Sequence, residues 1–306
     1  MKKFTYPSVC GGEIAAYRWE PAGKPTVILQ IAHGVAEYAL RYDDFACWLA
    51  ARGVLVVAED HSGHGATPGT PLYFPKGWDG VLDDITTLYA QTRKEFPDAP
   101  YFFLGHSMGS FLLRNLLFRG GLEGLSGAVV CGTGWQPGLI LGAGKLVAKL
   151  ERRRVGAQNH SPLMHSLMFG GYNKKFKPNR TPNDWLNTDE AAVDAYTADP
   201  LCGGKETIAL AADMLDGISR IQKKRNLSAM PKALPVYLIA GKSDPVGNMG
   251  KGVERSVRAF RGAGMRNVTM RLYDGRHEIL NEPNHTEVYE DVLNFVIKNQ
   301  KIVTSL

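Results

Sequence analysis

The sequence predicts an α/β fold, in which a doubly wound, mostly parallel sheet carries an inserted and mainly helical segment. The predicted strands are apolar nearly throughout rather than alternating, which is typical of strands buried on both faces of a parallel sheet. Segments with helical spacing alternate with these strands, as expected where helices cover both faces. The alternation stops after residue 132 and resumes near residue 205, which indicates an insertion.

Four strands and three helices account for the first part of the chain. The predicted strands are residues 27–32, 54–58, 101–104 and 128–131. The predicted helices are residues 43–52, 79–96 and 108–118. Gly53 follows the first helix and Pro97 the second, and both residue types commonly end helices.

Residues 133–204 have no evident strand and mix Gly, Pro, Asn and aromatic residues. The core pattern then resumes, with helices at residues 206–222, 253–261 and 285–297 and strands at residues 236–240 and 268–273. We therefore expect residues 1–132 and 205–306 to form the core. An insertion that follows the carboxyl end of a strand lies over the crevice where such sheets bind ligands. Residues 133–204 are thus expected to act as a cap.

The composition is that of an ordinary globular chain, since 44% of its 306 residues are hydrophobic and 22% are charged. No stretch approaches the roughly 18 apolar residues that span a bilayer. Lys2 and Lys3 are not followed by the apolar region of a signal peptide, so a cytoplasmic chain is expected. The four cysteines are widely spaced, and we predict that they are free thiols: Cys10, Cys47, Cys131 and Cys202.

The formal net charge is +6, and basic residues cluster at residues 152–154, 174–177 and 223–225. We interpret these clusters as solvated surface, because no nucleic-acid-binding motif accompanies them. Nucleic acid is therefore not an expected partner, and no metal or organic cofactor is implied. The oligomeric state stays open.

A candidate nucleophile lies between a predicted strand and a predicted helix. Residues 105–109 read Gly-His-Ser-Met-Gly and match G-x-S-x-G, with Ser107 at the centre. The turn from strand to helix is sharp, so a side chain at Gly105 or Gly109 would collide with its neighbours. The match is short enough to arise by chance, but its place after the strand at 101–104 favours a nucleophile.

A serine hydroxyl needs a base to take its proton, and the base needs an acid to orient it. Serine hydrolases with this kind of turn have the chain order Ser, acid, His. His277 is the one histidine of eight that lies just after a late core strand, so we predict that it is the base. Asp244 follows the preceding core strand and is the predicted acid. Asp274 is too close to His277 in sequence to reach around to it.

Acyl transfer also requires hydrogen-bond donors for the negative oxygen of the tetrahedral intermediate. One predicted donor is the backbone N–H of Met108, directly after the nucleophile. The second is the N–H of Val35, in the loop after the first predicted strand, where Gly34 permits an unusual turn. We expect the side chains of His33 and Glu37 to brace this loop by hydrogen bonds rather than to take part in the chemistry.

Four motifs now stand in order along the chain, at residues 33–37 (HGVAE), 60–65 (DHSGHG), 105–109 (GHSMG) and 276–282 (RHEILNE). Together they resemble the monoacylglycerol lipase and lysophospholipase family of α/β-hydrolases, also called the serine aminopeptidase S33 group. The resemblance covers the core, about three quarters of the chain, and implies a triad of Ser107, Asp244 and His277 with oxyanion donors at Val35 and Met108.

Two positions depart from the family pattern. Tyr38 follows Glu37 where the family commonly has His, and Ser110 stands where the family commonly has Gly. Ser110 is still small, so the helix after Ser107 can pack closely. Tyr38 leaves open what this position does at the mouth of the pocket. Within the insertion, residues 184–186 (DWL) and 196–201 (YTADPL) resemble bacterial lysophospholipases.

The predicted reaction is hydrolysis of a carboxylic ester through an acyl-enzyme on Ser107. The substrate is expected to be a small-molecule ester or lipid, a monoacylglycerol or a lysophospholipid-like molecule. Thioesterase and aminopeptidase action on the same triad stay open, as does a non-catalytic protein that binds a small ligand. Residues 137–150 carry leucines at helical spacing. Such a cap helix packs on the core, the reading we favour, or makes transient contact with a membrane surface.

Overall fold

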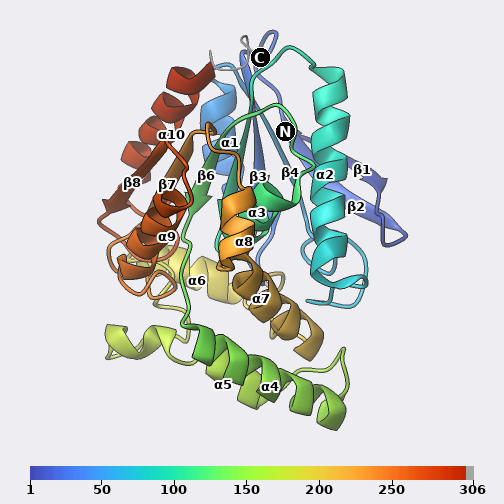
Figure 1. Cartoon of the computed structure of the whole chain (residues 1–306), viewed down its shortest axis with the longest axis vertical. Helices are drawn as coiled ribbons and strands as arrows, with labels where there is room; N and C mark the ends of the chain where they lie inside the picture. The colour runs from blue at the N-terminus through green and yellow to red at the C-terminus, as the bar shows by residue number, and fades with distance from the viewer. Residues whose placement is uncertain (301–306) are drawn as a thin grey trace.

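The computed structural model describes residues 1–300 and contains an eight-stranded sheet with helices on both faces (Figure 1). The strand order is β1-β2-β4-β3-β5-β6-β7-β8. The strands are β1 (Lys2–Pro7), β2 (Glu13–Trp19), β3 (Val27–Ala32), β4 (Val54–Glu59), β5 (Tyr101–His106), β6 (Leu125–Cys131), β7 (Val236–Gly241) and β8 (Val268–Tyr273). Residues 301–306, the end of the predicted core, lie outside the described part.

The predicted α/β-hydrolase fold class is confirmed, with a sheet that is mixed. β3 to β8 pair in parallel, whereas β1 pairs with β2 and β2 with β4 in antiparallel register. The parallel strands β3, β4, β5 and β7 are buried along their whole length, which explains their continuous apolar sequences. All six strands expected from the sequence are present.

The helices that flank the sheet form two layers, each over its own hydrophobic core. One layer contains α1 (Asp43–Ala50) and α10 (His285–Asn299), and the other contains α2 (Gly77–Glu95), α3 (Met108–Arg119) and α9 (Lys251–Gly262). Neighbouring residues of β3 point into different layers: Ile28 packs with the second and Leu29 with the first. The sheet is therefore doubly wound.

The parallel register brings the loops that carry the predicted site to one edge of the sheet. Ala32 at the end of β3 pairs with Gly105 near the end of β5, and β6, β7 and β8 end in the same direction. The loops that follow these strands therefore meet, although they lie far apart in sequence.

The segment between β6 and α7 (Ile208–Ile221) forms helices and adds no strand to the described sheet. It contains α4 (Gly138–Val155), α5 (Pro162–Met168), the 3-10 helix η2 (Tyr172–Phe176) and α6 (Glu190–Ala198). Figure 1 shows α4 and α5 beyond one end of the sheet, beneath α7. A short helix, α8 (Lys224–Ala229), then leads back to β7.

The apolar run at residues 137–150 forms part of α4, but only some of it packs on the core. Leu141 and Ala148 are buried against the rest of the molecule. Four other apolar side chains of α4 face outward, namely Leu139, Ile140, Leu146 and Leu150. The expectation that the apolar face of this helix packs on the core is therefore correct for one side of the helix and wrong for the other.

The cysteines and the hydropathy of the helices agree with the expectations from composition. Each of the four cysteines is unpaired, at positions that all fall within the described residues. Among residues 1–300, no helix combines the length and hydropathy needed to cross a membrane.

Candidate active site

Ser107 lies at the turn between β5 and α3 with an unusual backbone conformation, φ 53° and ψ −118°. A positive φ is costly for a residue with a side chain, so it persists only where the surroundings enforce it. The Ser107 N–H donates to the carbonyl of Cys131 at 3.0 Å, which ties the turn to the end of β6. The turn therefore presents Ser107 at the edge of the sheet where the other loops meet.

The two glycines of the motif allow this turn because their neighbours leave no room for a side chain. A Cβ at Gly105 would lie 2.3 Å from the carbonyl oxygen of Gly109. A Cβ at Gly109 would lie 2.1 Å from the carbonyl oxygen of Ala32, so α3 packs directly on the end of β3. The collision that the sequence predicts for a side chain at either glycine is thus a collision with backbone carbonyl oxygens.

His277 and Asp244 form a buried hydrogen-bonded pair beside Ser107. The Nδ1 atom of His277 lies 3.0 Å from Asp244 Oδ1, and their residues are 2% and 0% exposed. Asp244 Oδ1 also accepts the Val246 N–H at 2.8 Å, which fixes the carboxylate. Because Nδ1 donates to Asp244, Nε2 is left to accept a proton. Ser107 and His277 line the same cavity, and within the described residues no hydrogen bond joins them.

The loop after β3 lies against Ser107. A Cβ at Gly34 would lie 3.1 Å from the Cβ of Ser107. Val35 lines the cavity with Ser107, and its N–H makes no hydrogen bond within residues 1–300. Met108 is the first residue of α3, so its N–H has no acceptor within the helix. The two N–H groups expected at an oxyanion hole are therefore near the serine and not used by the helix or the loop.

Glu37 and His33 brace this loop from behind. Glu37 Oε1 accepts the Gly34 N–H at 2.6 Å and the Tyr42 hydroxyl at 2.9 Å. His33 Nδ1 lies 2.7 Å from the Gly34 carbonyl oxygen. Burial lowers the pKa of His33 to about 3, so its ring is neutral and Nδ1 carries the donated proton.

His106 is held beside the serine by hydrogen bonds from both ring nitrogens. Its Nδ1 lies 3.2 Å from Glu37 Oε1 and its Nε2 lies 3.3 Å from the His277 carbonyl oxygen. Burial disfavours the charged ring, but the Glu37 carboxylate outweighs burial and raises the pKa of His106 above its ordinary value. Despite burial, His106 and Arg41 in turn hold the pKa of Glu37 well below its usual range. His106 therefore connects the loop after β3 with the backbone of His277.

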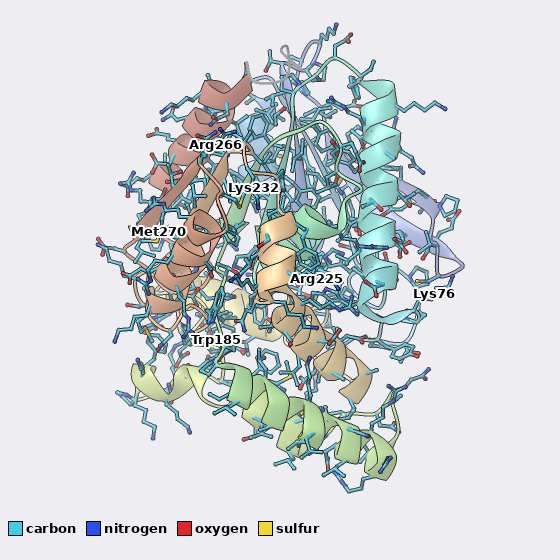
Figure 2. All side chains as sticks on the ribbon, in the orientation of Figure 1. Lys76, Trp185, Arg225, Lys232, Arg266 and Met270 are labelled. Carbon is cyan, nitrogen blue, oxygen red and sulfur yellow. The ribbon has the colours of Figure 1, made fainter. Side chains whose placement is uncertain are left out.

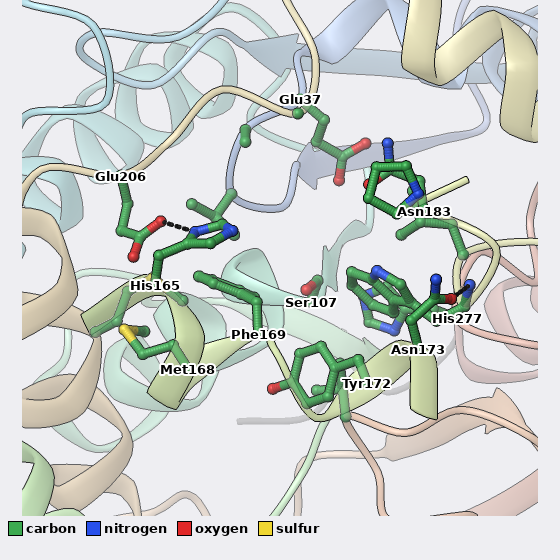
Figure 3. Close-up of a pocket in the computed structure, with 18 of the residues that line it drawn as sticks. Glu37, Ser107, His165, Met168, Phe169, Tyr172, Asn173, Asn183, Glu206 and His277 are labelled. Atoms are coloured by element: carbon green, nitrogen blue, oxygen red, sulfur yellow. Dashed lines mark hydrogen bonds and ion pairs between the residues drawn. The ribbon is translucent and has the colours of Figure 1, made fainter. Parts of the chain in front are cut away.

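A cavity of about 450 Å³ extends from Ser107 under the insertion (Figure 3). Its walls include apolar side chains at Phe111, Met168, Phe169, Met214 and Ile218. The ring of Trp185 lies over His277 with a centroid separation of 5.0 Å. Figure 2 shows Trp185 at the junction between the insertion and the core.

Several site residues were not found from the sequence. Arg41 forms a bidentate ion pair with Glu278, next to His277, with Nη2 and Oε2 2.8 Å apart. Arg276 donates to the carbonyls of Asp184 and, at 2.9 Å, Asn187. The RHE sequence at residues 276–278 indicates that this loop belongs to the site, but the partners of its side chains depend on tertiary packing.

Tyr38, the departure from the family pattern, donates to Asp199 Oδ2 at 2.7 Å and so joins the loop after β3 to the insertion. In the part of the chain that the structure describes, no cluster of three or more His, Cys, Asp or Glu side chains is arranged to hold a metal ion.

Comparison with known proteins gives consistent matches over most of the chain. A family model described as serine aminopeptidase, S33, matches residues 23–284. The monoglyceride lipase of Mus musculus is 27% identical over 284 residues, covering 91% of this chain and 82% of the mouse protein. The monoacylglycerol lipase of Mycolicibacterium smegmatis is 27% identical over 307 residues and 96% of each chain.

A solved structure agrees with these matches. The thermostable carboxyl esterase from Bacillus coagulans, solved in complex with glycerol, superposes with a TM-score of 0.89 at 28% identity. The match covers 97% of this chain and 98% of the esterase.

Proposed function

This chain belongs to the serine aminopeptidase S33 family of α/β-hydrolases and is a carboxylic ester hydrolase, and on that premise we propose that it cleaves esters through an acyl-enzyme on Ser107. The observation that carries the proposal is the strained Ser107 turn, in a cavity that it shares with His277, which is paired with the buried Asp244.

In this mechanism Ser107 Oγ attacks the ester carbonyl carbon while His277 Nε2 takes the hydroxyl proton. The N–H groups of Val35 and Met108 stabilise the oxyanion. Collapse of the intermediate breaks the bond to the alcohol, which leaves with the proton from His277. A water molecule, deprotonated by His277, then attacks the acyl-enzyme and releases the acid. Asp244 orients His277 and stabilises its charged form in both steps.

The decisive test replaces the nucleophile. Ser107→Ala is expected to abolish turnover of p-nitrophenyl esters and labelling by a fluorophosphonate probe, because only an activated serine reacts. Ser228→Ala, at an exposed serine on α8, is the matched control and is expected to retain both. Turnover that persists in Ser107→Ala would overturn the assignment, and wild-type protein that neither labels nor turns over would favour a ligand-binding protein instead.

We further propose a monoacylglycerol or a similar medium-chain ester as the substrate class. Support comes from the names of the relatives and from the glycerol bound to the Bacillus coagulans esterase. Lysophospholipids, acyl thioesters and aminoacyl amides are the competing substrates on the same triad. Comparing kcat/KM across these four classes with one acyl chain length tests the choice, and a lysophospholipid preference would overturn it.

We also propose transient contact between the insertion and a lipid surface, in a cytoplasmic chain with free thiols. The support is an outward apolar face on α4 and α5, where Leu139 is 90% exposed and Leu146, Leu150, Leu163 and Leu167 are all more than half exposed. Leu146→Glu with Leu150→Glu is expected to reduce sedimentation with phosphatidylglycerol vesicles. Ile297→Glu, on α10 and away from the insertion, is the control and is expected to sediment like the wild type.

A further inference from the structure

A second histidine–carboxylate pair lies in the wall of the cavity, separate from His277 and Asp244. His165, on α5, places its Nδ1 2.8 Å from Oε2 of Glu206, in the segment just before α7. Both residues line the cavity that contains Ser107. The mechanism above does not use this pair.

The pair lies on the acyl side of Ser107. His277 protonates the leaving alcohol, so the alcohol half of the substrate lies beside His277. Figure 3 shows His165 and Glu206 on the other side of Ser107 from His277, together with Met168 and Phe169. The His165 ring is 5.4 Å from the Phe169 ring, so the polar pair lies next to apolar side chains of the cavity wall.

The pair has hydrogen-bonding capacity that the protein leaves unused. Glu206 is only 3% exposed, and its buried Oε1 has no partner in the described residues. His165 donates from Nδ1 to Glu206, which leaves Nε2 as a hydrogen-bonding atom with no partner within residues 1–300. The His165 side chain is 38% exposed, so its Nε2 is the atom of the pair that is open to a ligand. An alkyl chain packed against that nitrogen supplies no hydrogen bond, whereas a hydroxyl group does, because it both donates and accepts.

We propose that His165 and Glu206 form a specificity site for a hydroxyl group on the acyl chain, so that the enzyme favours hydroxyacyl esters over plain acyl esters of equal length. The inference rests on the proposed acyl-enzyme function and adds the chemistry of the acyl group. The pair also connects α5 to the segment before α7, and a purely structural tether would affect both kinds of ester equally.

The experiment compares p-nitrophenyl esters of increasing chain length, each as the plain acyl chain and as its ω-hydroxy counterpart. At the length that reaches His165, the ratio of kcat/KM for the hydroxy ester to that for the plain ester is expected to rise by about tenfold over shorter chains. His165→Phe is expected to remove that rise, and His165→Gln, which keeps a hydrogen-bonding group, to retain part of it.

The control is Ser166→Ala, which changes an exposed residue of α5 that does not line the cavity. It is expected to keep the wild-type ratio. A wild-type ratio that stays flat at every length, or a ratio unchanged in His165→Phe, would overturn the inference. Fluorophosphonate labelling of Ser107 separates the two hypotheses: labelled, active protein with a flat ratio refutes only the specificity site.

Discussion

Individual histidines in the site have different roles, and the neighbours of each buried ring decide the direction of its pKa shift. Burial lowers the pKa of His33, which has no carboxylate partner at its ring nitrogens, whereas Glu37 beside His106 raises the pKa of that ring. The same residue type is therefore shifted in opposite directions at two buried positions. His277 differs from both, since its Nδ1 atom pairs with Asp244.

Replacing the acid tests the role of that pair. Asp244→Asn keeps the shape of the side chain but no longer favours the proton on His277 Nδ1 or stabilises the imidazolium. We expect kcat for p-nitrophenyl esters to fall by about 10³–10⁴-fold with little change in stability. Asp274→Asn, at an exposed carboxylate paired with Lys242, is the control and is expected to keep wild-type kcat. Equal activity of the two variants would contradict the assignment of Asp244.

The buried carboxyl of Glu59 predicts how the stability of the fold depends on pH. Glu59 on β4 is 1% exposed, and burial raises its pKa to about 8 despite the hydrogen bond from Tyr6. The folded protein therefore keeps this proton at pH values where the unfolded chain has lost it. The stability that the folded protein gains from keeping this proton is fully present below about pH 4.5 and is lost as pH rises toward about 8.

Glu59→Gln cannot ionise, so it removes this contribution to the pH dependence. Relative to the variant, we expect the wild type to lose on the order of 1.4 kcal/mol of unfolding free energy per pH unit in that window. Urea denaturation of both proteins at several pH values measures the difference. Glu13→Gln, at an exposed position of β2, is the control, and its unfolding free energy is expected to change with pH as that of the wild type does. A difference in unfolding free energy between the wild type and Glu59→Gln that is the same at every pH would contradict the prediction.

At the scale of elements, the site depends on how closely α3 approaches β3. Gly109 brings the first turn of α3 against the carbonyl of Ala32, and Ala32 is next to the loop that carries Val35. Ser107, the predicted nucleophile, and Val35, the second predicted oxyanion donor, are thus positioned by one contact between two elements.

Gly109→Ala is therefore expected to destabilise the fold by more than about 3 kcal/mol, because its Cβ would lie 2.1 Å from a backbone oxygen that cannot move freely. Gly142→Ala is the matched control on α4, since a Cβ there meets nothing within 4 Å. It is expected to stabilise by about 0.5–1 kcal/mol, as Gly is costly inside a helix. Urea unfolding compares the two, and similar effects would refute the packing argument.

The elements differ in how far the sequence predicts them. β3 to β7 are predictable because burial on both faces requires nearly continuous apolar runs, whereas β8, at the edge of the sheet, is partly exposed. β1 and β2 were missed: β1 buries little besides Tyr6, and β2 contains Ala15 and Ala16, which have low strand propensity. α5 and α6 were missed because they are short and depend on caps at Ser161 and Asp189 rather than on a long apolar pattern.

The residues of the candidate site also differ in how far the sequence predicts them. Ser107, Asp244 and His277 could be proposed from the order of strands and loops, because parallel strands bring those loops to one edge. Trp185 over His277 and the His165–Glu206 pair join the insertion to the core. Their positions follow from how the insertion packs, which no short motif encodes.

At the scale of the whole molecule, the insertion and the core share a hydrogen-bonded junction around the site. Tyr196 donates to the Ala36 carbonyl at 3.0 Å, beside the predicted oxyanion donor. The Glu278 N–H, next to His277, donates to the Leu186 carbonyl at 2.8 Å. The loops that carry Val35 and His277 are therefore attached to the part of the insertion that contains Trp185 and α6.

Arg276→Met removes the donor to two carbonyls of that junction, at Asp184 and Asn187. We expect kcat/KM to fall by about tenfold, since Trp185 loses part of the support that holds it over His277. Arg258→Met, at an exposed arginine of α9, is expected to leave kcat/KM unchanged. Steady-state kinetics with circular dichroism checks both, and an unaffected Arg276→Met would show that the junction does not position the site.

The junction also determines which part of the chain is suited to being exchanged between relatives by protein engineering. α4 and α5 are connected to α7 and its approach through Lys145–Asp216 and His165–Glu206, and within residues 1–300 no hydrogen bond joins them to the loops around Ser107. A graft of residues 138–168 therefore changes the cavity wall around His165 and leaves the loop of Val35 attached as before. Residues 184–203 contain the Leu186 and Tyr196 connections, so a graft of this segment must bring matching core loops with it.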